Sequence, residues 1–306
     1  MYIFSKIKKR IFIYSVIIFL VFFISISLNI NSIKNTSTFI NNSYESIKEF
    51  DFDCDGKNDE LSIISVNSTY SIKIKNSIGD ILLKSKKFDY SLFDVTPSCK
   101  VNIYYVDLNR NKIPEIIVSG IKNNKSAFYI FQWVDNIFEE VLFSEDNILG
   151  ILDYNNSRTP KIYTTNSKYG DKGTNGYILN SNNIKNINFS NPKILSLNNI
   201  QTLINIIEAD YELDDSPDIF TSFIPSEELG LLWNLDKLTY RYSFQRGYFY
   251  DMSWDDSGKV TSIFWCLSFE KVNFCNSNKE PEELTLYIKA DLDELSNYKI
   301  SSISKN

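Results

Sequence analysis

Residues 51–61 read Asp51-Phe52-Asp53-Cys54-Asp55-Gly56-Lys57-Asn58-Asp59-Glu60-Leu61, the most specific chemical pattern in the chain. Acidic residues stand at positions 1, 3, 5 and 9, glycine stands at position 6, and an apolar run from 61 to 66 follows. Carboxylates two residues apart around a glycine turn direct several oxygens at one centre. Ca²⁺ takes six to eight oxygen ligands at about 2.3–2.6 Å. The stretch therefore predicts a calcium-binding loop that leads directly into a β-strand.

This first loop, residues 51–59, is not an EF-hand. An EF-hand needs a bidentate acid at position 12, and position 12 here is Ser62, inside the apolar run. Four acids within nine residues repel one another without a counter-ion, which disfavours the alternative of a plain solvated turn. The predicted ligands are the side chains of Asp51, Asp53, Asp55 and Asp59 and the backbone carbonyl of Lys57.

The loop recurs twice, and each copy lies between two strand-like runs. The second loop, residues 107–115, reads Asp107-Leu108-Asn109-Arg110-Asn111-Lys112-Ile113-Pro114-Glu115, and the third, residues 153–161, reads Asp153-Tyr154-Asn155-Asn156-Ser157-Arg158-Thr159-Pro160-Lys161. The first aspartates are 56 and 46 residues apart. This period, with three or four strands per unit, is typical of propeller-type repeats. The abundance of Tyr and Phe also favours a mainly β fold.

The later copies carry less negative charge than the first. In the third loop Ser157 and Lys161 replace acids, and because an ammonium at a ligand position repels a cation, we expect a metal-free turn. The second loop predicts either a weaker calcium site or a metal-free turn, with Lys112 in place of the glycine. Its candidate ligands are Asp107, Asn109, Asn111, the carbonyl of Ile113, and Glu115.

The pattern Asp-x-[Asp/Asn]-x-[Asp/Asn]-Gly-x-x-[Asp/Glu] between two strands resembles the FG-GAP or VCBS-type repeat of integrin α-subunit propellers and many bacterial surface proteins. The resemblance covers about residues 46–190 and is strongest at 51–61. It implies β-propeller blades whose inter-strand loops hold Ca²⁺. The family fold usually has about seven blades, whereas three are recognisable here. We therefore expect a partial, open or merged arrangement rather than a closed propeller.

The N-terminus carries a membrane signal. Residues 11–28 are uncharged and apolar apart from three serines, and as a helix they would span roughly 27 Å, close to a hydrocarbon core of about 30 Å. Basic residues precede them, which places the N-terminus in the cytoplasm and the rest outside. A cleaved signal peptide with a weak Ser25-x-Ser27 site is the alternative. The predicted parts are a basic cytoplasmic tail (1–10), a transmembrane signal-anchor (11–29) and a linker (30–45).

The composition of the chain excludes several classes of function. The chain has no histidine, which removes the commonest general base and most zinc sites. Beyond the four N-terminal basic residues, 28 Lys and Arg stand against 38 Asp and Glu, a net charge of −10. Such a surface suits divalent cations and does not suit nucleic acid.

The pattern changes after the repeats. We predict a β repeat domain over 46–191 and a C-terminal α+β domain over 192–306. In the second, helical spacing covers 197–210, a short helix begins near Pro225, and strands are expected over 238–244, 247–254, 260–272 and 284–290.

The sequence leaves two alternatives for the cysteines, and the other acidic patterns have structural explanations. The four cysteines predict either two disulfides, with Cys54–Cys99 and Cys266–Cys275 as the favoured pairs, or free thiols. The acidic stretch 210–218 has the loop spacing but follows a helical segment, so we interpret it as a helix exit. Adjacent acids occur at turns or helix starts, where a structural role suffices: Glu227-Glu228, Asp255-Asp256 and Glu282-Glu283.

These observations favour a membrane-anchored, extracytoplasmic, calcium-binding β-repeat protein of a bacterial cell envelope. We expect a non-catalytic binding or adhesion module that contacts an envelope protein or a glycan, with Ca²⁺ bracing its loops. The alternatives are an envelope hydrolase that uses carboxylates and a structural member of a membrane complex.

Overall fold

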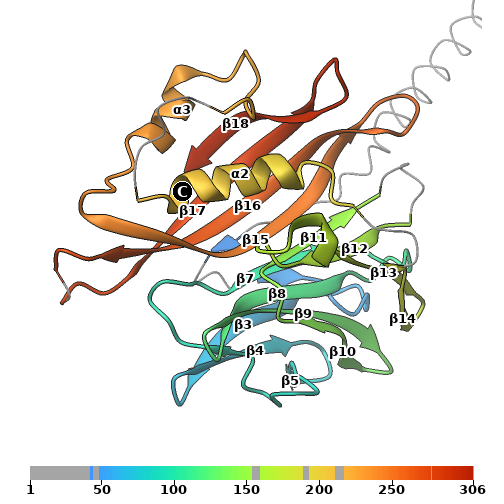
Figure 1. Cartoon of the computed structure of the whole chain (residues 1–306). Helices are drawn as coiled ribbons and strands as arrows, with labels where there is room; N and C mark the ends of the chain where they lie inside the picture. The colour runs from blue at the N-terminus through green and yellow to red at the C-terminus, as the bar shows by residue number, and fades with distance from the viewer. Residues whose placement is uncertain are drawn as a thin grey trace, which may run out of the picture. The chain divides into compact units, whose positions relative to one another are not determined.

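The computed structural model describes residues 42–43, 48–153, 159–188, 193–210, 217–276 and 278–305. Phe39–Asn306 form one compact unit. Its described part is mainly β with two α-helices, which confirms the predicted class (Figure 1). The described strands form three sheets, each with an open strand order.

The first predicted repeat is an antiparallel sheet with its strands in sequence order. The strands are β2 (Lys48–Phe50), β3 (Asp59–Val66), β4 (Thr69–Lys75) and β5 (Asp80–Leu82), with β6 (Phe93–Asp94) beside the start of β4. The first loop connects β2 to β3. The strand expected over 81–88 ends at Leu82, and a bridge between Ser85 and Asp89 follows it.

The second repeat has the same strand order. Its strands are β7 (Asn102–Val106), β8 (Glu115–Lys122), β9 (Lys125–Val134) and β10 (Ile137–Ser144), and β1 (Asn42–Ser43) pairs with the outer side of β7. The second loop connects β7 to β8. The first two loops therefore occupy the same place in two equivalent antiparallel units, between the first strand and the second.

The third repeat is again a four-stranded unit. Its strands are β11 (Ile148–Leu152), β12 (Lys161–Thr165), β13 (Asn175–Asn180) and β14 (Asn183–Asn186), with the 3₁₀ helix η1 (Gly170–Gly173) between β12 and β13. The third loop connects β11 to β12, and its residues 154–158 lie outside the described part.

The C-terminal strands extend the sheet of the third repeat. They are β15 (Tyr240–Trp254), β16 (Val260–Asn273), β17 (Glu282–Leu292) and β18 (Tyr298–Lys305). β15 runs parallel to β11, with Gly150 opposite Phe249, so eight strands form one sheet. Two predictions were wrong in detail. The strands expected over 238–244 and 247–254 are one strand with an irregularity after Phe244, and β18 was not predicted.

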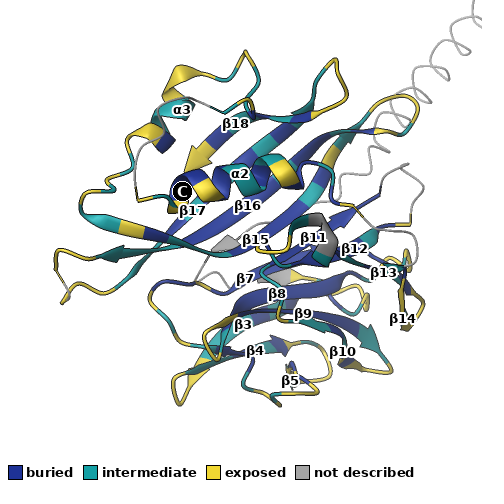
Figure 2. Cartoon of the chain, in the orientation of Figure 1, coloured by how far each residue is buried: buried dark blue, intermediate teal, exposed yellow. Residues whose placement is uncertain are grey.

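Apolar faces join the repeats to one another. On β8, Ile116 packs into the core shared with the first repeat, while its neighbour Ile117 packs into the core shared with the third. Because successive side chains of a strand point to opposite faces, the second repeat lies between the other two. Figure 2 shows the corresponding continuous burial along β8 and β9.

Two helices confirm the helical predictions of the C-terminal part. They are α2 (Leu197–Glu208) and α3 (Ser226–Trp233). The apolar residues of α2 recur at helical spacing, so Ile200, Leu203 and Ile207 share one face. That face packs on the core of β15–β18 around Trp265, whose Nε1 donates to Ser196 Oγ at 2.8 Å.

Among the described residues, no helix is long and apolar enough to cross a membrane. The predicted tail (1–10) and signal-anchor (11–29), and all of the linker (30–45) except residues 42 and 43, lie outside the described residues.

Candidate metal centre

The first loop hydrogen-bonds its own backbone through its carboxylates. Asp51 accepts the N–H of Asp55 on Oδ1 at 3.1 Å and the N–H of Gly56 on Oδ2 at 3.0 Å. Asp53 Oδ1 also accepts the Asp55 N–H, at 3.0 Å, and Asp55 Oδ1 accepts the N–H of Lys57 at 2.8 Å. Side-chain bonds to backbone groups a few residues further on are typical of Asx turns. They hold the loop in a tight coil.

Asp59 supplies the buried side of the loop. It is the first residue of β3 and is only 1% exposed. Its Oδ2 accepts the N–H of Phe52 at 2.7 Å, but its Oδ1 has no hydrogen-bond partner in the described structure. One carboxylate oxygen from each of Asp51, Asp53 and Asp59 lies within 4.8 Å of the others. Burial, and then the charges of the neighbouring aspartates, raise the pKa of Asp59.

A turn of the same repeat holds two of the carboxylates from outside. Asn76, after β4, donates from Nδ2 to Asp53 Oδ2 at 3.0 Å, and the Ser77 hydroxyl donates to Asp55 Oδ2. The Ser77 bond is the main cause that lowers the pKa of Asp55. These two residues are not part of the predicted site, although Asn76-Ser77-Ile78-Gly79 has the composition of a turn.

The structure therefore brings together three of the four predicted acidic ligands. The Asp55 carboxylate is not in the cluster and is held by Ser77 and Lys57. The cluster offers oxygen ligands only, which suits a hard cation such as Ca²⁺. A buried carboxylate oxygen without a partner is costly to leave unsatisfied, and a cation between the three carboxylates would satisfy it. The residues fit the ion that the sequence predicts.

The second loop repeats this backbone architecture bond for bond. Asp107 accepts the N–H of Asn111 at 3.1 Å and the N–H of Lys112 at 3.0 Å. Asn109 Oδ1 accepts the Asn111 N–H at 2.9 Å, and Asn111 Oδ1 accepts the Ile113 N–H at 2.8 Å. Every one of these bonds has its counterpart at the same position of the first loop. The internal repeat is therefore structural as well as sequential.

The two loops also share two left-handed residues. At position 4, Cys54 has φ 57° and Arg110 has φ 65°. At position 6, Gly56 has φ 87° and Lys112 has φ 74°. A residue other than glycine in this region costs roughly 1 kcal/mol. Lys112 keeps the turn shape at that cost.

The loops differ at position 9. Glu115 is buried, and its Oε2 accepts the N–H of Leu108 at 2.6 Å, as Asp59 does for Phe52. Its Oε1, however, accepts the Asn109 amide at 3.0 Å. Burial raises the pKa of Glu115 to about 8. The second loop thus satisfies its buried acid with an amide group, where the first loop leaves an oxygen open.

Position 4 connects each loop to the next. Cys54 Sγ lies 3.3 Å from the carbonyl oxygen of Lys112, and Arg110 pairs with Asp153 Oδ2 at 3.3 Å. The first loop therefore contacts the second, and the second contacts the third. These contacts could not be predicted from the sequence, because position 4 is not a ligand position and its residue differs in each copy.

The remaining predicted groups are dispersed. None of the four cysteines forms a disulfide, which agrees with the second of the two alternatives predicted for them. In the acidic stretch 210–218, Asp210 pairs with Arg241 and Asp218 with Lys299, and residues 211–216 lie outside the described part. The adjacent acids have separate partners. Glu228 accepts the Ile303 N–H, Asp255 accepts the N–H of Ser257 and of Lys259, Glu282 pairs with Lys271 and Lys279, and Glu283 pairs with Arg246.

A buried acid beside the third loop predicts a pH effect. Asp251 is 5% exposed, its Oδ2 accepts the Asp153 N–H at 2.6 Å, and Asp153 in turn pairs with Arg110. Burial raises the pKa of Asp251 to about 6. The folded state therefore binds this proton more tightly than the unfolded state does. Its contribution to stability is complete below pH 4 and is lost as the pH rises through about 6.

Asp251→Asn removes this titration while keeping an acceptor for Asp153. We expect the free energy of unfolding of the variant, relative to the natural protein, to rise by on the order of 2 kcal/mol between pH 4 and pH 7. Urea unfolding at several pH values measures it. Asp256→Asn, in the exposed turn after β15, controls for the loss of one negative charge. A constant difference across this range for Asp251→Asn would contradict the expectation.

The chain matches no protein-family model, and no curated protein matches it.

Proposed function

We propose that the protein is a calcium-binding β-repeat protein whose first loop holds one Ca²⁺. Two observations on the buried Asp59 carry the proposal. Its Oδ1 has no hydrogen-bond partner in the described structure, and one of its carboxylate oxygens lies within 4.8 Å of an oxygen of Asp51 and of Asp53. Three converging carboxylates repel one another and are stabilised by a divalent cation. When bound, Ca²⁺ supplies positive charge and oxygen coordination, and the chain's own residues orient the loop between β2 and β3.

The second loop, in this proposal, is the same structural element without the ion. Glu115 has partners for both oxygens, and burial raises the pKa of its carboxyl, which disfavours the charged form that would bind a cation. Its Asn109 amide donates into the space where a cation would need a lone pair. Calcium would therefore stabilise the first loop, whereas the second loop would be stabilised by its own hydrogen bonds.

The wider role that we propose is a non-catalytic binding module of a bacterial cell envelope. Three antiparallel units with equivalent loop positions support FG-GAP or VCBS-like blades in a merged arrangement, because the third unit shares a sheet with β15–β18. Each carboxylate of the first loop accepts at least one backbone N–H of that loop, which favours bracing over catalysis. The apolar residues 11–28 of the predicted anchor and the net charge of −10 beyond the N-terminal basic residues support a membrane-anchored chain with its acidic part outside.

Calcium should raise the melting temperature of the full chain in detergent. At a free concentration about 100 times the Kd, a ligand adds about 2.7 kcal/mol, which for a unit of this size is on the order of 5–10 °C. Circular dichroism melts in EGTA, in Ca²⁺ and in Mg²⁺ measure the effect. We expect a rise with Ca²⁺ that Mg²⁺ reproduces weakly, because Mg²⁺ dehydrates reluctantly.

Matched variants in the first and second loops test which of the two loops binds the ion. Asp53→Asn keeps the acceptor for the Asp55 N–H but removes a charged ligand, and we expect it to abolish the calcium shift. Asp107→Asn makes the corresponding change in the second loop and should leave the shift intact. An unchanged melting temperature in EGTA and Ca²⁺ would overturn the calcium proposal. Loss of the shift in Asp107→Asn alone would move the ion to the second loop.

A further inference from the structure

The turn between β4 and β5, residues 76–79, has hydrogen bonds of its own that fix its shape. The backbone N–H and carbonyl groups of Asn76 and Gly79 pair with each other at 3.1 and 3.2 Å. Asn76 Oδ1 accepts the N–H of Ile78 at 3.0 Å and the N–H of Gly79 at 3.1 Å. These bonds hold the Asn76 side chain in one orientation. Its Nδ2 is then directed at the first loop.

Asn76 holds Asp53 from outside the first loop. Asn76 Nδ2 donates to Asp53 Oδ2 at 3.0 Å, while Asp53 Oδ1 accepts the Asp55 N–H at 3.0 Å. Each carboxylate oxygen has two lone pairs, so both oxygens of Asp53 are oriented and each keeps a lone pair for a cation. Asp53 is one of the three aspartates with carboxylate oxygens within 4.8 Å of one another. The Asn76 amide therefore positions one member of the cluster.

Ser77, the next residue of the turn, holds the remaining acid of the loop outside the cluster. Its hydroxyl donates to Asp55 Oδ2, and Asp55 Oδ1 accepts the Lys57 N–H at 2.8 Å. Of the acids at positions 1, 3, 5 and 9, Asp55 is the one that does not belong to the cluster. For its carboxylate to join the other three, we expect it to rotate away from Ser77 and lose that hydrogen bond.

We propose, on the basis of the calcium site proposed above, that the turn 76–79 selects the ligands of the ion. Asn76 positions Asp53 as a ligand, and Ser77 withholds Asp55. Calcium affinity depends on the number of charged ligands and on the rigidity of the site. With three carboxylates instead of four, the site has a Kd on the order of 0.1–1 mM, the range of extracellular calcium-binding modules. The turn thereby adjusts the first loop to calcium outside the cell.

Two variants of the turn should change the calcium affinity in opposite directions. Ser77→Ala removes the hydroxyl that holds Asp55, and because Asp55 can then join the ion, we expect the Kd to fall about threefold to tenfold. Asn76→Ser keeps a turn-forming side chain that is too short to hold Asp53, and the Kd should rise by a similar factor. Isothermal titration calorimetry with Ca²⁺ on the full chain in detergent measures both. A general loosening of the turn would weaken binding in both variants.

The coordination of the ion gives a second readout. Tb³⁺ is a luminescent substitute for Ca²⁺, and its decay rates in H₂O and D₂O report the number of water molecules bound to it. Because the ion takes a limited number of oxygens, a carboxylate that joins it displaces water. Ser77→Ala should therefore bind about one water fewer than the natural protein does. The double change Ser77→Ala with Asp55→Asn should lose the gain in affinity, and Asp55→Asn alone should change the Kd less than about threefold.

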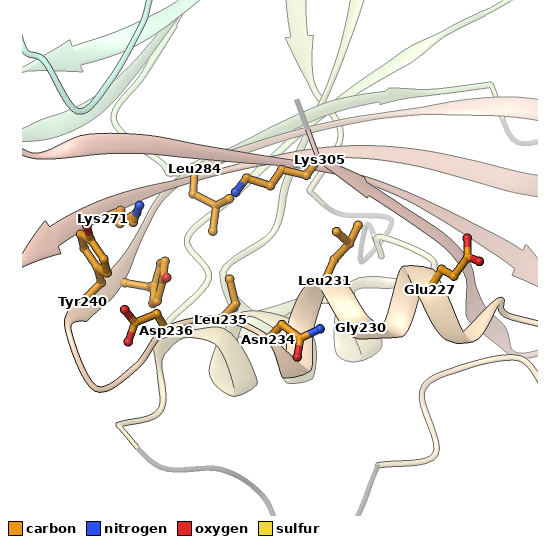
Figure 3. A pocket seen from close by; sticks show the side chains of 11 residues that line it. Glu227, Gly230, Leu231, Asn234, Leu235, Asp236, Tyr240, Lys271, Leu284 and Lys305 are labelled. Carbon is orange, nitrogen blue, oxygen red and sulfur yellow. The ribbon is translucent and has the colours of Figure 1, made fainter.

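Matched controls outside the turn should bind Ca²⁺ as the natural protein does. Ser65→Ala removes an exposed serine of β3. Asn234→Ser changes an exposed asparagine that follows α3 and lines a cavity between this helix and the C-terminal sheet, outside the repeats (Figure 3). These controls separate the effect of the turn from that of losing a serine or an asparagine elsewhere.

Three results would overturn ligand selection by the turn while leaving the calcium site in place. They are equal affinity in Ser77→Ala and Ser65→Ala, weaker binding in Ser77→Ala, and loss of binding in Asp55→Asn, which would make Asp55 a ligand. In each case Asp53→Asn still tests the site by itself. If the natural protein bound no Ca²⁺, both the calcium site and the selection of its ligands would be wrong.

Discussion

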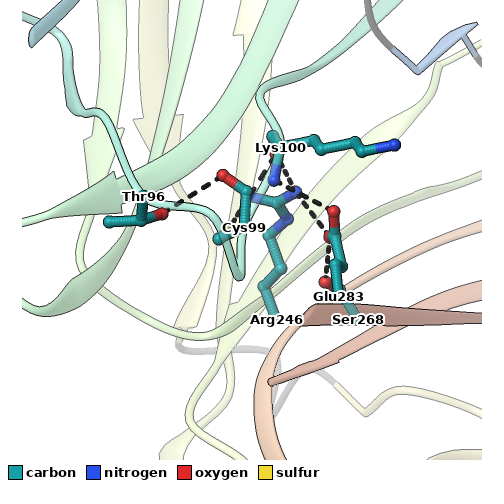
Figure 4. Close-up of polar contacts among 6 residues, drawn as sticks. All are labelled: Thr96, Cys99, Lys100, Arg246, Ser268 and Glu283. Atoms are coloured by element: carbon teal, nitrogen blue, oxygen red, sulfur yellow. Dashed lines mark hydrogen bonds and ion pairs between the residues drawn. The ribbon is translucent and has the colours of Figure 1, made fainter. Parts of the chain in front are cut away.

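Arg246→Met is expected to lower the free energy of unfolding by about 3–5 kcal/mol, because it leaves a buried carboxylate without its counter-charge. Arg246 lies on β15, is 2% exposed, and ion-pairs with Glu283 at 3.4 Å (Figure 4). It also donates to Cys99 Sγ and to the carbonyl of Lys100. Glu283 accepts from the Ser268 hydroxyl and the Lys100 N–H as well.

This network holds the segment between the first and second repeats against the C-terminal strands. Its two side chains are 3% and 6% exposed, so solvent cannot replace the pair. Arg241→Met removes an arginine from the same strand, but that side chain is 64% exposed and its ion pair with Asp210 spans 3.7 Å. We expect Arg241→Met to cost less than about 1 kcal/mol.

Urea unfolding of the two variants measures the contrast. The double change Arg246→Met with Glu283→Met should recover at least half of the loss, since it removes the unpaired charge as well as its partner. If Arg246→Met cost no more than Arg241→Met, the network would not hold these segments together. If the double variant were less stable than Arg246→Met, the loss would come from packing and not from charge.

Gly150→Ala should cost about 3 kcal/mol by overpacking the joint between β11 and β15. A Cβ at Gly150 would lie 2.3 Å from ring atoms of Phe249, the residue opposite it in the parallel pair. Phe249 is fully buried and stacks on Trp265 with ring centroids 4.4 Å apart. Because Phe249 is buried and its ring contacts Trp265, we expect the strands to separate or Trp265 to shift.

Gly230→Ala is a control of opposite sign. Gly230 lies inside α3, where an added Cβ meets only the Asn234 side chain, at 3.4 Å. Alanine in a helix interior is favoured over glycine by about 0.5–1 kcal/mol, so this variant should be slightly more stable. Thermal unfolding by calorimetry compares the two. Equal stabilities for Gly150→Ala and the natural protein would mean that the β11–β15 pairing is looser than described.

The elements that could be predicted from the sequence are those that depend on interactions between residues close together in the chain. The first and second loops stand between paired strands because Asx chemistry, left-handed positions and flanking apolar runs are all encoded within about ten residues. α2 is predictable because Leu203 and Ile207 repeat at helical spacing. The end of β5 at Leu82 was not predictable from the apolar and basic residues that follow it.

Within the candidate site, the acidic residues could be predicted from the sequence. The difference between the hydrogen-bond partners of Asp59 and those of Glu115 could not. Asp59 and Glu115 occupy the same position and accept the same backbone N–H group. Only the fold shows that the Asn109 amide reaches Glu115 while Asp59 Oδ1 stays open. Asn76 and Ser77 are 23 and 22 residues away in sequence from the aspartates to which they donate, and no local rule encodes these contacts.

By itself, then, the sequence determined a mainly β chain with three related loops, two later helices and one strongly acidic turn. Each of these depends on interactions between near neighbours, which spacing and residue type record directly. The tertiary structure alone decided that β15 pairs with β11, that Arg246 joins segments 146 residues apart, and which loop keeps an unsatisfied carboxylate. These depend on burial and on strand pairing over long separations, where loop closure and packing select the partner and the sequence pattern carries no record of the choice.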